Sequence, residues 1–166
     1  MSRSRLFPLV LLSLPLSPVR LPAQVVETIH VVITGGAAAG TYDVSATSLG
    51  CSYAVAAPDA WASNYRIPNA DPKKLSYVGL IIPDSAAAAK GTSEFYLEVG
   101  FGPVRQLSPD YVVQTRTDVS VKQEGSGTAT VADHGSTATI TFSGQTAAGV
   151  KLQGTVECKS VYRNPG

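Results

Sequence analysis

The stretch that decides the fold is residues 136–158, which read STATITFSGQTAAGVKLQGTVEC. In its first half Ala, Ile and Phe alternate with Thr and Ser, and in its second half apolar residues alternate with Lys, Gln, Thr and Glu. A period of two is typical of strands that bury one face. The Gly-containing loop 145–149 therefore joins the two strands of an antiparallel hairpin, and Cys158 lies on the buried face.

The same period recurs along most of the chain. The turn sequence Asp133-His134-Gly135 joins a strand at 128–131 to the hairpin, which gives a three-stranded meander. Alternating segments predict further strands at 25–33, 41–47, 51–55, 94–101 and 111–122, and the apolar segment 75–82 predicts another. About eight or nine short strands separated by Gly, Pro, Asn and Asp predict an all-β antiparallel β-sandwich, Ig-like or jelly-roll-like, with a small β-barrel as the alternative.

Two segments depart from simple alternation. Residues 75–82 (LSYVGLII) are apolar on both faces, as expected of a central strand or of one that a loop covers. Residues 84–91 (DSAAAAKG) begin with an N-cap residue, continue with good helix formers and end on Gly. The second segment therefore predicts a short connecting helix.

The first 23 residues have the composition of a secretory signal peptide. Two arginines precede the apolar run 6–16 (LFPLVLLSLPL), and residues 21–23 (LPA) form a cleavage site. The apolar run is about half as long as the roughly 20 residues that a spanning helix needs, so we expect cleavage rather than a membrane anchor. Residues 24–166 are then a single exported domain, in the bacterial periplasm or outside the cell.

Composition narrows the class of partner. Removal of residues 1–23 takes away three arginines and leaves 10 basic and 12 acidic side chains, a formal charge of −2. Nucleic-acid binding depends on an excess of basic side chains, so we expect no nucleic-acid partner. We also expect no membrane span after cleavage, a monomer, and, from the Ala- and Gly-rich composition, a bacterial source.

The chain contains two cysteines, Cys51 and Cys158. Both lie in phase with apolar neighbours, so both are expected to face the core. Two cysteines in an exported chain usually form one disulfide, because the compartment is oxidising. Closing a loop of this length restricts the unfolded chain and contributes roughly 4 to 5 kcal/mol on the chain-entropy model.

Few residues could carry catalysis. His30 alternates onto the polar face of its strand, and His134 occupies a tight turn, so neither suggests a metal ligand. Glu94 and Glu98 are about 13 Å apart along an extended strand, farther than the roughly 5 to 9.5 Å between glycosidase carboxylates. The Gly-rich run 34–40 lacks the Lys of a phosphate loop, and no Gly-x-Ser-x-Gly motif is present. We therefore expect no enzymatic activity, metal site or cofactor.

The segment 58–71 is the candidate binding loop. It contains the chain's one tryptophan, and aromatic side chains beside amides and Arg suit sugars or a partner surface. The alternative is that the tryptophan plugs the end of the sandwich and buries its ring. The candidate binding residues are Trp61, Tyr65, Arg66 and Asn69.

The C-terminal third carries a resemblance to a known family. The runs GTATV at 127–131, TITFSG at 139–144 and GTVEC at 154–158 resemble the closing strands of the mycobacterial surface lipoprotein antigens. The resemblance implies a cell-envelope β-domain with no established catalytic residues, and Cys51 would correspond to the first disulfide cysteine of those antigens. The chain departs from the family because it lacks the lipid-bearing cysteine, which puts surface anchoring in question.

Two functions fit these observations best. The first is an exported, non-enzymatic interaction module of the cell envelope or the medium, with an unknown protein or small-molecule partner. The second is a carrier that holds an apolar ligand or a sugar between its strands, with the segment 58–71 as a gate. Two further functions have no sharp motif in the sequence. One is an assembly subunit that exposes the strand 75–82 as an edge, and the other is an enzyme that uses Asp59, Asp71 and Asp110.

Overall fold

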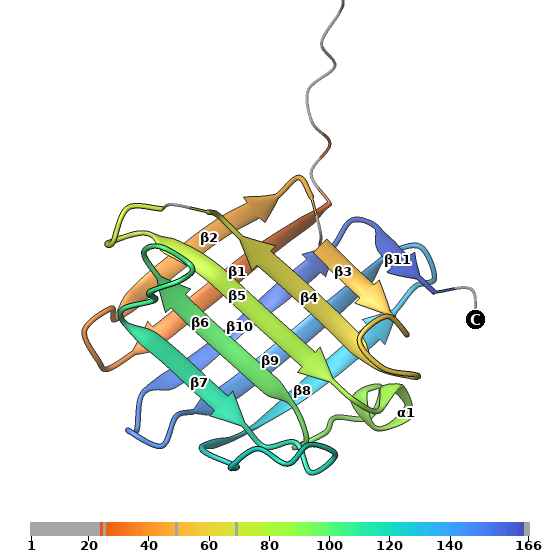
Figure 1. Ribbon diagram of the computed structural model, residues 1–166. Coiled ribbons are helices and arrows are strands. Elements are labelled where there is room, and N and C mark those ends of the chain that lie inside the picture. The colour runs from red at the N-terminus through yellow and green to blue at the C-terminus, as the bar shows by residue number, and fades with distance from the viewer. Residues whose placement is uncertain (1–23, 25, 49, 69, 165–166) are drawn as a thin grey trace, which may run out of the picture.

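The computed structural model describes residues 24, 26–48, 50–68 and 70–164. These residues form two sheets that lie face to face, and their strands cross in Figure 1. The sheet at the back has the order β2-β1-β10-β9-β8, and the sheet at the front has the order β11-β3-β4-β5-β6-β7. The predicted sandwich is confirmed. The barrel alternative is wrong, because within the described residues the two sheets do not close on each other.

The elements follow one another with short connections. The strands are β1 (Glu27–Thr34), β2 (Gly40–Ala46), β3 (Gly50–Tyr53), β4 (Trp61–Arg66), β5 (Leu75–Ile82), β6 (Tyr96–Phe101), β7 (Asp110–Gln114), β8 (Ser126–Asp133), β9 (Ala138–Gln145), β10 (Lys151–Cys158) and β11 (Val161–Arg163). One helix, α1 (Ser85–Ala88), lies between β5 and β6. Asp84 caps it by accepting hydrogen bonds from the backbone N–H groups of Ala86 and Ala87, as its sequence predicts.

The predicted C-terminal meander is confirmed. Strand β9 lies between β8 and β10, and β1 pairs with the other side of β10. The turn between β8 and β9 contains Gly135 at φ +80°, a backbone conformation that glycine adopts without strain. His30 alternates to the exposed face of β1, as expected from the sequence.

The core fills the space between the sheets with inward side chains from both. Its largest fully buried members are Trp61, Phe95, Phe101, Phe142, Ile29, Leu80, Ile82, Leu97, Ile140 and Leu152. Complete burial of one such side chain is worth about 1.5–3 kcal/mol relative to exposure. Strand β5 crosses the middle of the six-stranded sheet, which confirms the central position that its apolar sequence predicts.

Two differences from the predicted strands concern β7 and β11. The strand expected at 111–122 ends at Gln114, which exchanges backbone hydrogen bonds with Glu124, so residues 115–123 form an excursion between these two positions. Val119 and Val121 alternate with polar residues in the sequence, but both lie beyond the end of β7, and Val121 is 60% exposed. Strand β11 was not predicted, because its three residues are too few to show a period.

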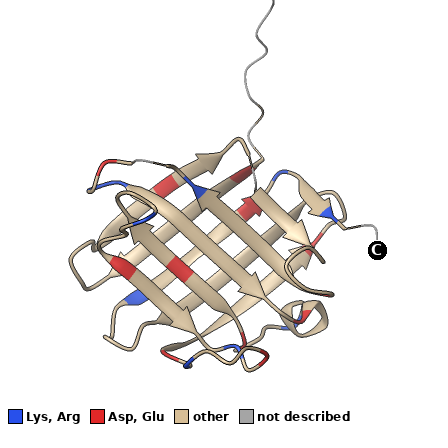
Figure 2. Cartoon of the chain, in the orientation of Figure 1, with Lys and Arg blue, Asp and Glu red and all other residues tan. Residues whose placement is uncertain are grey.

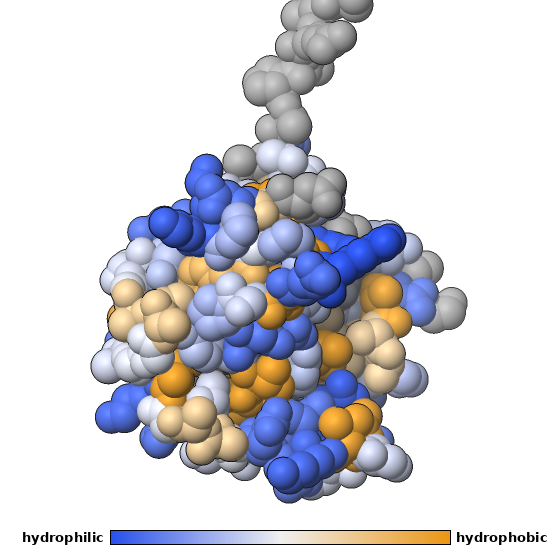
Figure 3. Space-filling view, turned by 60° about the vertical axis from the view of Figure 1, so that its left-hand side comes forward, coloured by the Kyte–Doolittle hydropathy of each residue, from blue (hydrophilic) through white to orange (hydrophobic). Residues whose placement is uncertain are grey.

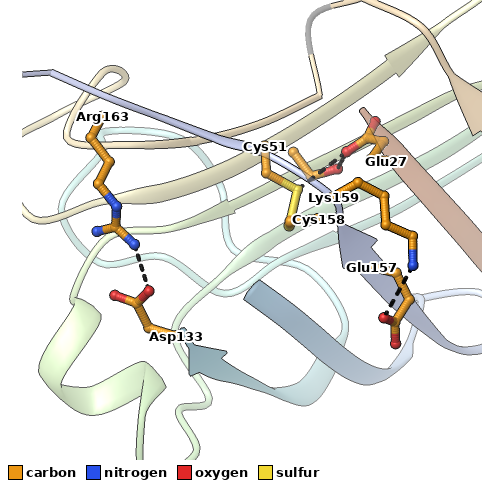
Figure 4. Close-up of a disulfide and its surroundings, with 8 residues drawn as sticks. Glu27, Cys51, Asp133, Glu157, Cys158, Lys159 and Arg163 are labelled. Atoms are coloured by element: carbon orange, nitrogen blue, oxygen red, sulfur yellow. Dashed lines mark hydrogen bonds and ion pairs between the residues drawn. A yellow bond between two sulfur atoms is a disulfide. The ribbon is translucent and has the colours of Figure 1, made fainter. Parts of the chain in front are cut away.

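A disulfide joins Cys51 of β3 to Cys158 of β10, as predicted, and so connects the two facing sheets (Figure 4). The two residues are 1% and 2% exposed. Directly after Cys158 the chain crosses to the other sheet, where β11 pairs in parallel with β3. The backbone N–H groups of Lys159 and Ser160 both donate to the carbonyl of Val26 and fix this crossing.

Replacing both cysteines by alanine is expected to lower the free energy of unfolding by roughly 4 to 5 kcal/mol, because the bond closes a loop of 107 residues in the unfolded chain. Urea titration followed by circular dichroism measures the change. Reduced wild-type protein should unfold close to the double variant. A loss below about 1 kcal/mol would contradict a main role in restricting the unfolded chain.

Candidate functional site

The predicted binding loop is a strand instead. Residues 61–66 form β4 inside the six-stranded sheet, and Trp61 and Tyr65 point into the core at 2% and 3% exposure. Of the candidate binding residues, Arg66 reaches the surface, and Asn69 lies outside the described residues. The alternation of β4 is hard to recognise in the sequence because Ser63 holds the middle inward position between the two aromatic residues.

The Trp61 ring acts as a plug, as the alternative interpretation predicts. It packs against Tyr53 at a centroid distance of 5.3 Å, and the guanidinium of Arg163 lies 5.2 Å from the centroid of each of these rings. Arg163 is held by an ion pair with Asp133 (Figure 4). Its Nε also donates a hydrogen bond to the carbonyl of Gly135. These contacts hold β11 in place and leave Trp61 too buried to contact a ligand.

The two histidines are exposed on separate elements, His30 on β1 and His134 in the turn between β8 and β9. His30 Nδ1 lies 2.7 Å from Asp43 Oδ1 on the exposed face of the five-stranded sheet. The described part of the chain contains no hydrogen bond from a serine or threonine to this pair. It also contains no group of three or more His, Cys, Asp or Glu side chains that could hold a metal ion.

Glu27 is a fully buried carboxyl group next to the disulfide (Figure 4). Its Oε2 accepts a hydrogen bond of 2.9 Å from Ser63 Oγ and lies 3.4 Å from the Cys51 sulfur. The latter is a contact only, because a disulfide sulfur carries no hydrogen. Oε1 has no hydrogen-bond partner in the described residues. Burial raises the pKa of Glu27, and the hydrogen bond from Ser63 lowers it in part. With 0% exposure, Glu27 cannot reach a substrate.

Replacing Glu27 by glutamine is expected to make the protein more stable than wild type at alkaline pH. The raised pKa means that the folded state binds this proton more tightly than the unfolded state does, so wild-type stability falls as pH rises above the ordinary value of 4.5. Glutamine keeps the shape of the side chain without the charge. Urea unfolding between pH 4 and 9 measures both curves; parallel curves would contradict a titrating Glu27.

The outward face of β4 to β7 carries a different set of residues. The register places Arg66, Tyr77, Gly100 and Asp110 directly opposite one another across the four strands. The next row contains Asn64, Gly79, Glu98 and Val112, and a third row contains Ala62, Ile81, Tyr96 and Gln114. We refer to Asn64, Arg66, Tyr77, Tyr96, Glu98 and Asp110 as the tyrosine face. In Figure 2 the charged positions of β6 and β7 are acidic, and β4 ends on a basic one.

Two glycines shape this surface. A Cβ atom added at Gly79 would stand 2.6 Å from Tyr77 Oη and 2.9 Å from both Cε1 and Cζ, so the Tyr77 ring extends over Gly79. A Cβ atom at Gly100 would stand 2.5 Å from Leu107 Cδ1. The Tyr77 and Leu107 side chains therefore lie close to the backbone of the sheet. At the centre of the tyrosine face, no Cβ atom projects from Gly79 or Gly100.

The charge of Glu98 affects the pKa values of several neighbours on this face. Its Oε2 accepts a hydrogen bond from the hydroxyl of half-buried Tyr96. Desolvation by burial raises the pKa of Tyr96, and the hydrogen bond to Glu98 and its charge raise it further. Burial also raises the pKa of Tyr77, with the Glu98 charge as the next cause. Both phenols therefore remain hydrogen-bond donors at neutral pH.

Asp110 is strongly perturbed. Loss of hydration raises its pKa from 3.8 to about 6, and the charges of Glu98 and Glu124 add to the rise, while a hydrogen bond from the Tyr111 backbone opposes it. Its side chain is exposed at the start of β7, so the surrounding residues remove water from it only in part. A carboxyl group with a pKa of about 6 stands out among the described residues.

A groove of about 550 Å³ begins at the Arg66 end of the tyrosine face. Its walls are Arg66 and Pro68 on one side and the segment 103–106 of the β6–β7 connection on the other. In Figure 3, which brings this side of the molecule forward, apolar side chains reach the surface between groups of hydrophilic ones. The groove widens the surface that a ligand on the tyrosine face could contact.

Comparison with known proteins does not add a family. No protein-family model, curated protein or solved structure matches the chain. Among the described residues, no helix is long and apolar enough to cross a membrane.

The sequence contained part of the signal for this site. The alternation of residues 94–101 predicts a strand and places Glu94 and Glu98 on one face of it, but their spacing does not indicate a site. Tyr77 lies in a segment that is apolar on both faces, so the sequence does not show which of its residues face outward. What the sequence could not supply is the register that places these residues beside Arg66 and Asp110.

Replacing Asp110 by asparagine is expected to remove a loss of stability between about pH 4 and pH 6. A raised pKa favours the protonated carboxyl in the folded state, so wild-type protein loses stability as pH rises through this window. The variant should match wild type at pH 3.5 and exceed it at pH 7.5, by up to about 1 kcal/mol because the group is exposed. Thermal unfolding measures this; equal profiles would contradict the assignment.

Proposed function

We propose that the protein is an exported, non-enzymatic interaction module whose binding surface is the tyrosine face. The observation that carries this proposal is the gathering of two tyrosines, two carboxylates, an arginine and an asparagine on one outward sheet face. Binding sites typically combine apolar or aromatic surface with a few placed polar groups. Perturbed ionisable groups such as Asp110 also cluster at functional sites.

Export is supported by two independent features. The first 23 residues have a signal-like composition, and the disulfide needs an oxidising compartment to persist. The bacterial envelope or the medium is then the place where a partner would be met. The resemblance of the closing strands to envelope antigens agrees with this location.

The carrier alternative has less support. A carrier needs an enclosed space between its sheets, and the centre of this sandwich is filled by side chains such as Phe101, Phe142 and Leu80, which are all at most 2% exposed. The openings found in the described residues lie at the surface and at the sheet edges. An outer surface therefore offers more contact area to a ligand than the interior does.

The experiment places a photo-crosslinking amino acid at Asn64 on the tyrosine face or at Thr141 on the outer face of the other sheet. Both positions are exposed strand residues, which makes them a matched pair. Each full-length variant is exported by its bacterial host, purified, and irradiated with the surface fraction of the source organism. Intact mass should show loss of residues 1–23 and of the two cysteine hydrogens.

Discrete adducts from position 64, with none from position 141, are the expected result. Adducts from position 141 alone would move the binding surface to the other sheet. Absence of adducts from both positions would contradict the interaction module itself, and an unprocessed chain would contradict export.

A further inference from the structure

The centre of the tyrosine face has the composition and shape of a surface for a flat ligand. Tyr77 is half buried, and the hydroxyl edge of its ring lies over Gly79, so the ring stays close to the sheet while part of it remains exposed to a ligand. Aromatic rings offer a broad apolar surface at a low cost in conformational entropy, since only two side-chain torsions must be fixed. This arrangement supplies stacking without a deep pocket.

Polar groups surround that ring on several sides. Arg66 lies opposite Tyr77, while Asn64 and Glu98 lie opposite Gly79 on either side of it. Within the described residues, the Asn64 amide, the Arg66 guanidinium and Glu98 Oε1 make no side-chain hydrogen bond. The set therefore offers donors from Arg66, an acceptor from Glu98, and both from Asn64.

We propose that the tyrosine face binds the pyranose rings of a polysaccharide, with Tyr77 stacking on the apolar side of a ring and with Asn64, Arg66 and Glu98 bonding its hydroxyl groups. A sugar ring has an apolar side of C–H groups and a rim of hydroxyls that each donate and accept. The mixture of acceptors and donors around Tyr77 matches that rim better than it matches a ligand of one charge. This inference rests on the proposed function and specifies the ligand class.

A single cation or anion fits less well. The carboxylates Glu98 and Asp110 would attract a cation, but Arg66 opposes it at the other end of the row that contains Asp110. The groove beyond Arg66 contains a second arginine, Arg105, which likewise favours partners with negative or neutral polar groups. A neutral ligand with many hydroxyls makes use of both ends, and the groove extends the surface for further sugar units.

Gly79 provides a sharp test because it controls the ring without removing it. A Cβ at this position would meet the outer end of the Tyr77 side chain, which can swing away at little cost, and the backbone of Gly79 needs no positive φ. Gly79→Ala should therefore leave the fold intact and displace the ring. Tyr77→Ala removes the ring, Glu98→Gln removes the charged acceptor, and Thr141→Ala on the other sheet is the control.

The experiment uses the oxidised mature protein and measures saturation transfer by NMR to cellohexaose, chitohexaose, mannohexaose and a galactan hexamer. Wild-type protein and the control variant should transfer saturation to the C–H groups of at least one probe. Tyr77→Ala and Gly79→Ala should weaken its binding by about tenfold or more, which corresponds to about 1.4 kcal/mol. Glu98→Gln should weaken it by a smaller factor, since hydrogen bonds to charged groups are roughly twice as strong as neutral ones.

No transfer to any of the four probes would overturn the carbohydrate assignment, and so would binding that Tyr77→Ala and Gly79→Ala leave unchanged. The crosslinking experiment separates this failure from a failure of the proposed function. Protein adducts from position 64 together with no sugar binding would retain the interaction module and replace its ligand by a protein. Circular dichroism of each variant shows that any loss of binding is not a loss of fold.

Discussion

The bond between Cys51 and Cys158 holds the two sheets together at one corner of the sandwich, and the surrounding structure is arranged around it. The chain crosses between sheets immediately after Cys158, so β11 lies beside β3 and Arg163 reaches the Tyr53 and Trp61 rings. Glu27, at the start of β1, is enclosed by the same corner. A buried carboxyl group costs free energy unless it is protonated or hydrogen-bonded, and Ser63 meets part of that need.

The sequence predicts those parts of the fold in which alternation is strict. The strands β8, β9 and β10 and the inward cysteine Cys158 can be identified because apolar residues recur on one side of each strand with no polar residue between them. Strand β4 was missed because Ser63 breaks the apolar row, and the reason for a serine there is Glu27, a contact across 36 residues. Local patterns do not contain that information.

The candidate site illustrates the same limit more strongly. Its six residues come from the four strands β4 to β7, and their proximity depends on these strands pairing in one particular register. A shift of one residue in any pair would send the side chains of that strand to the core. In the sequence, Gly79 is a residue that ordinarily weakens a strand. The structure shows that a side chain at this position would collide with the Tyr77 ring, which extends over it.

The two faces of the six-stranded sheet are under different constraints. The inward face contains apolar side chains and the disulfide, whose contribution is to stability. The outward face contains Asp110, whose ionisation near pH 6 opposes folding, and Glu98, whose charge raises the pKa values of its neighbours. An outward position would accept many neutral residues at no cost to the core. A carboxyl group such as Asp110, whose ionisation opposes folding, therefore fits the binding role proposed for this face better than a role in folding.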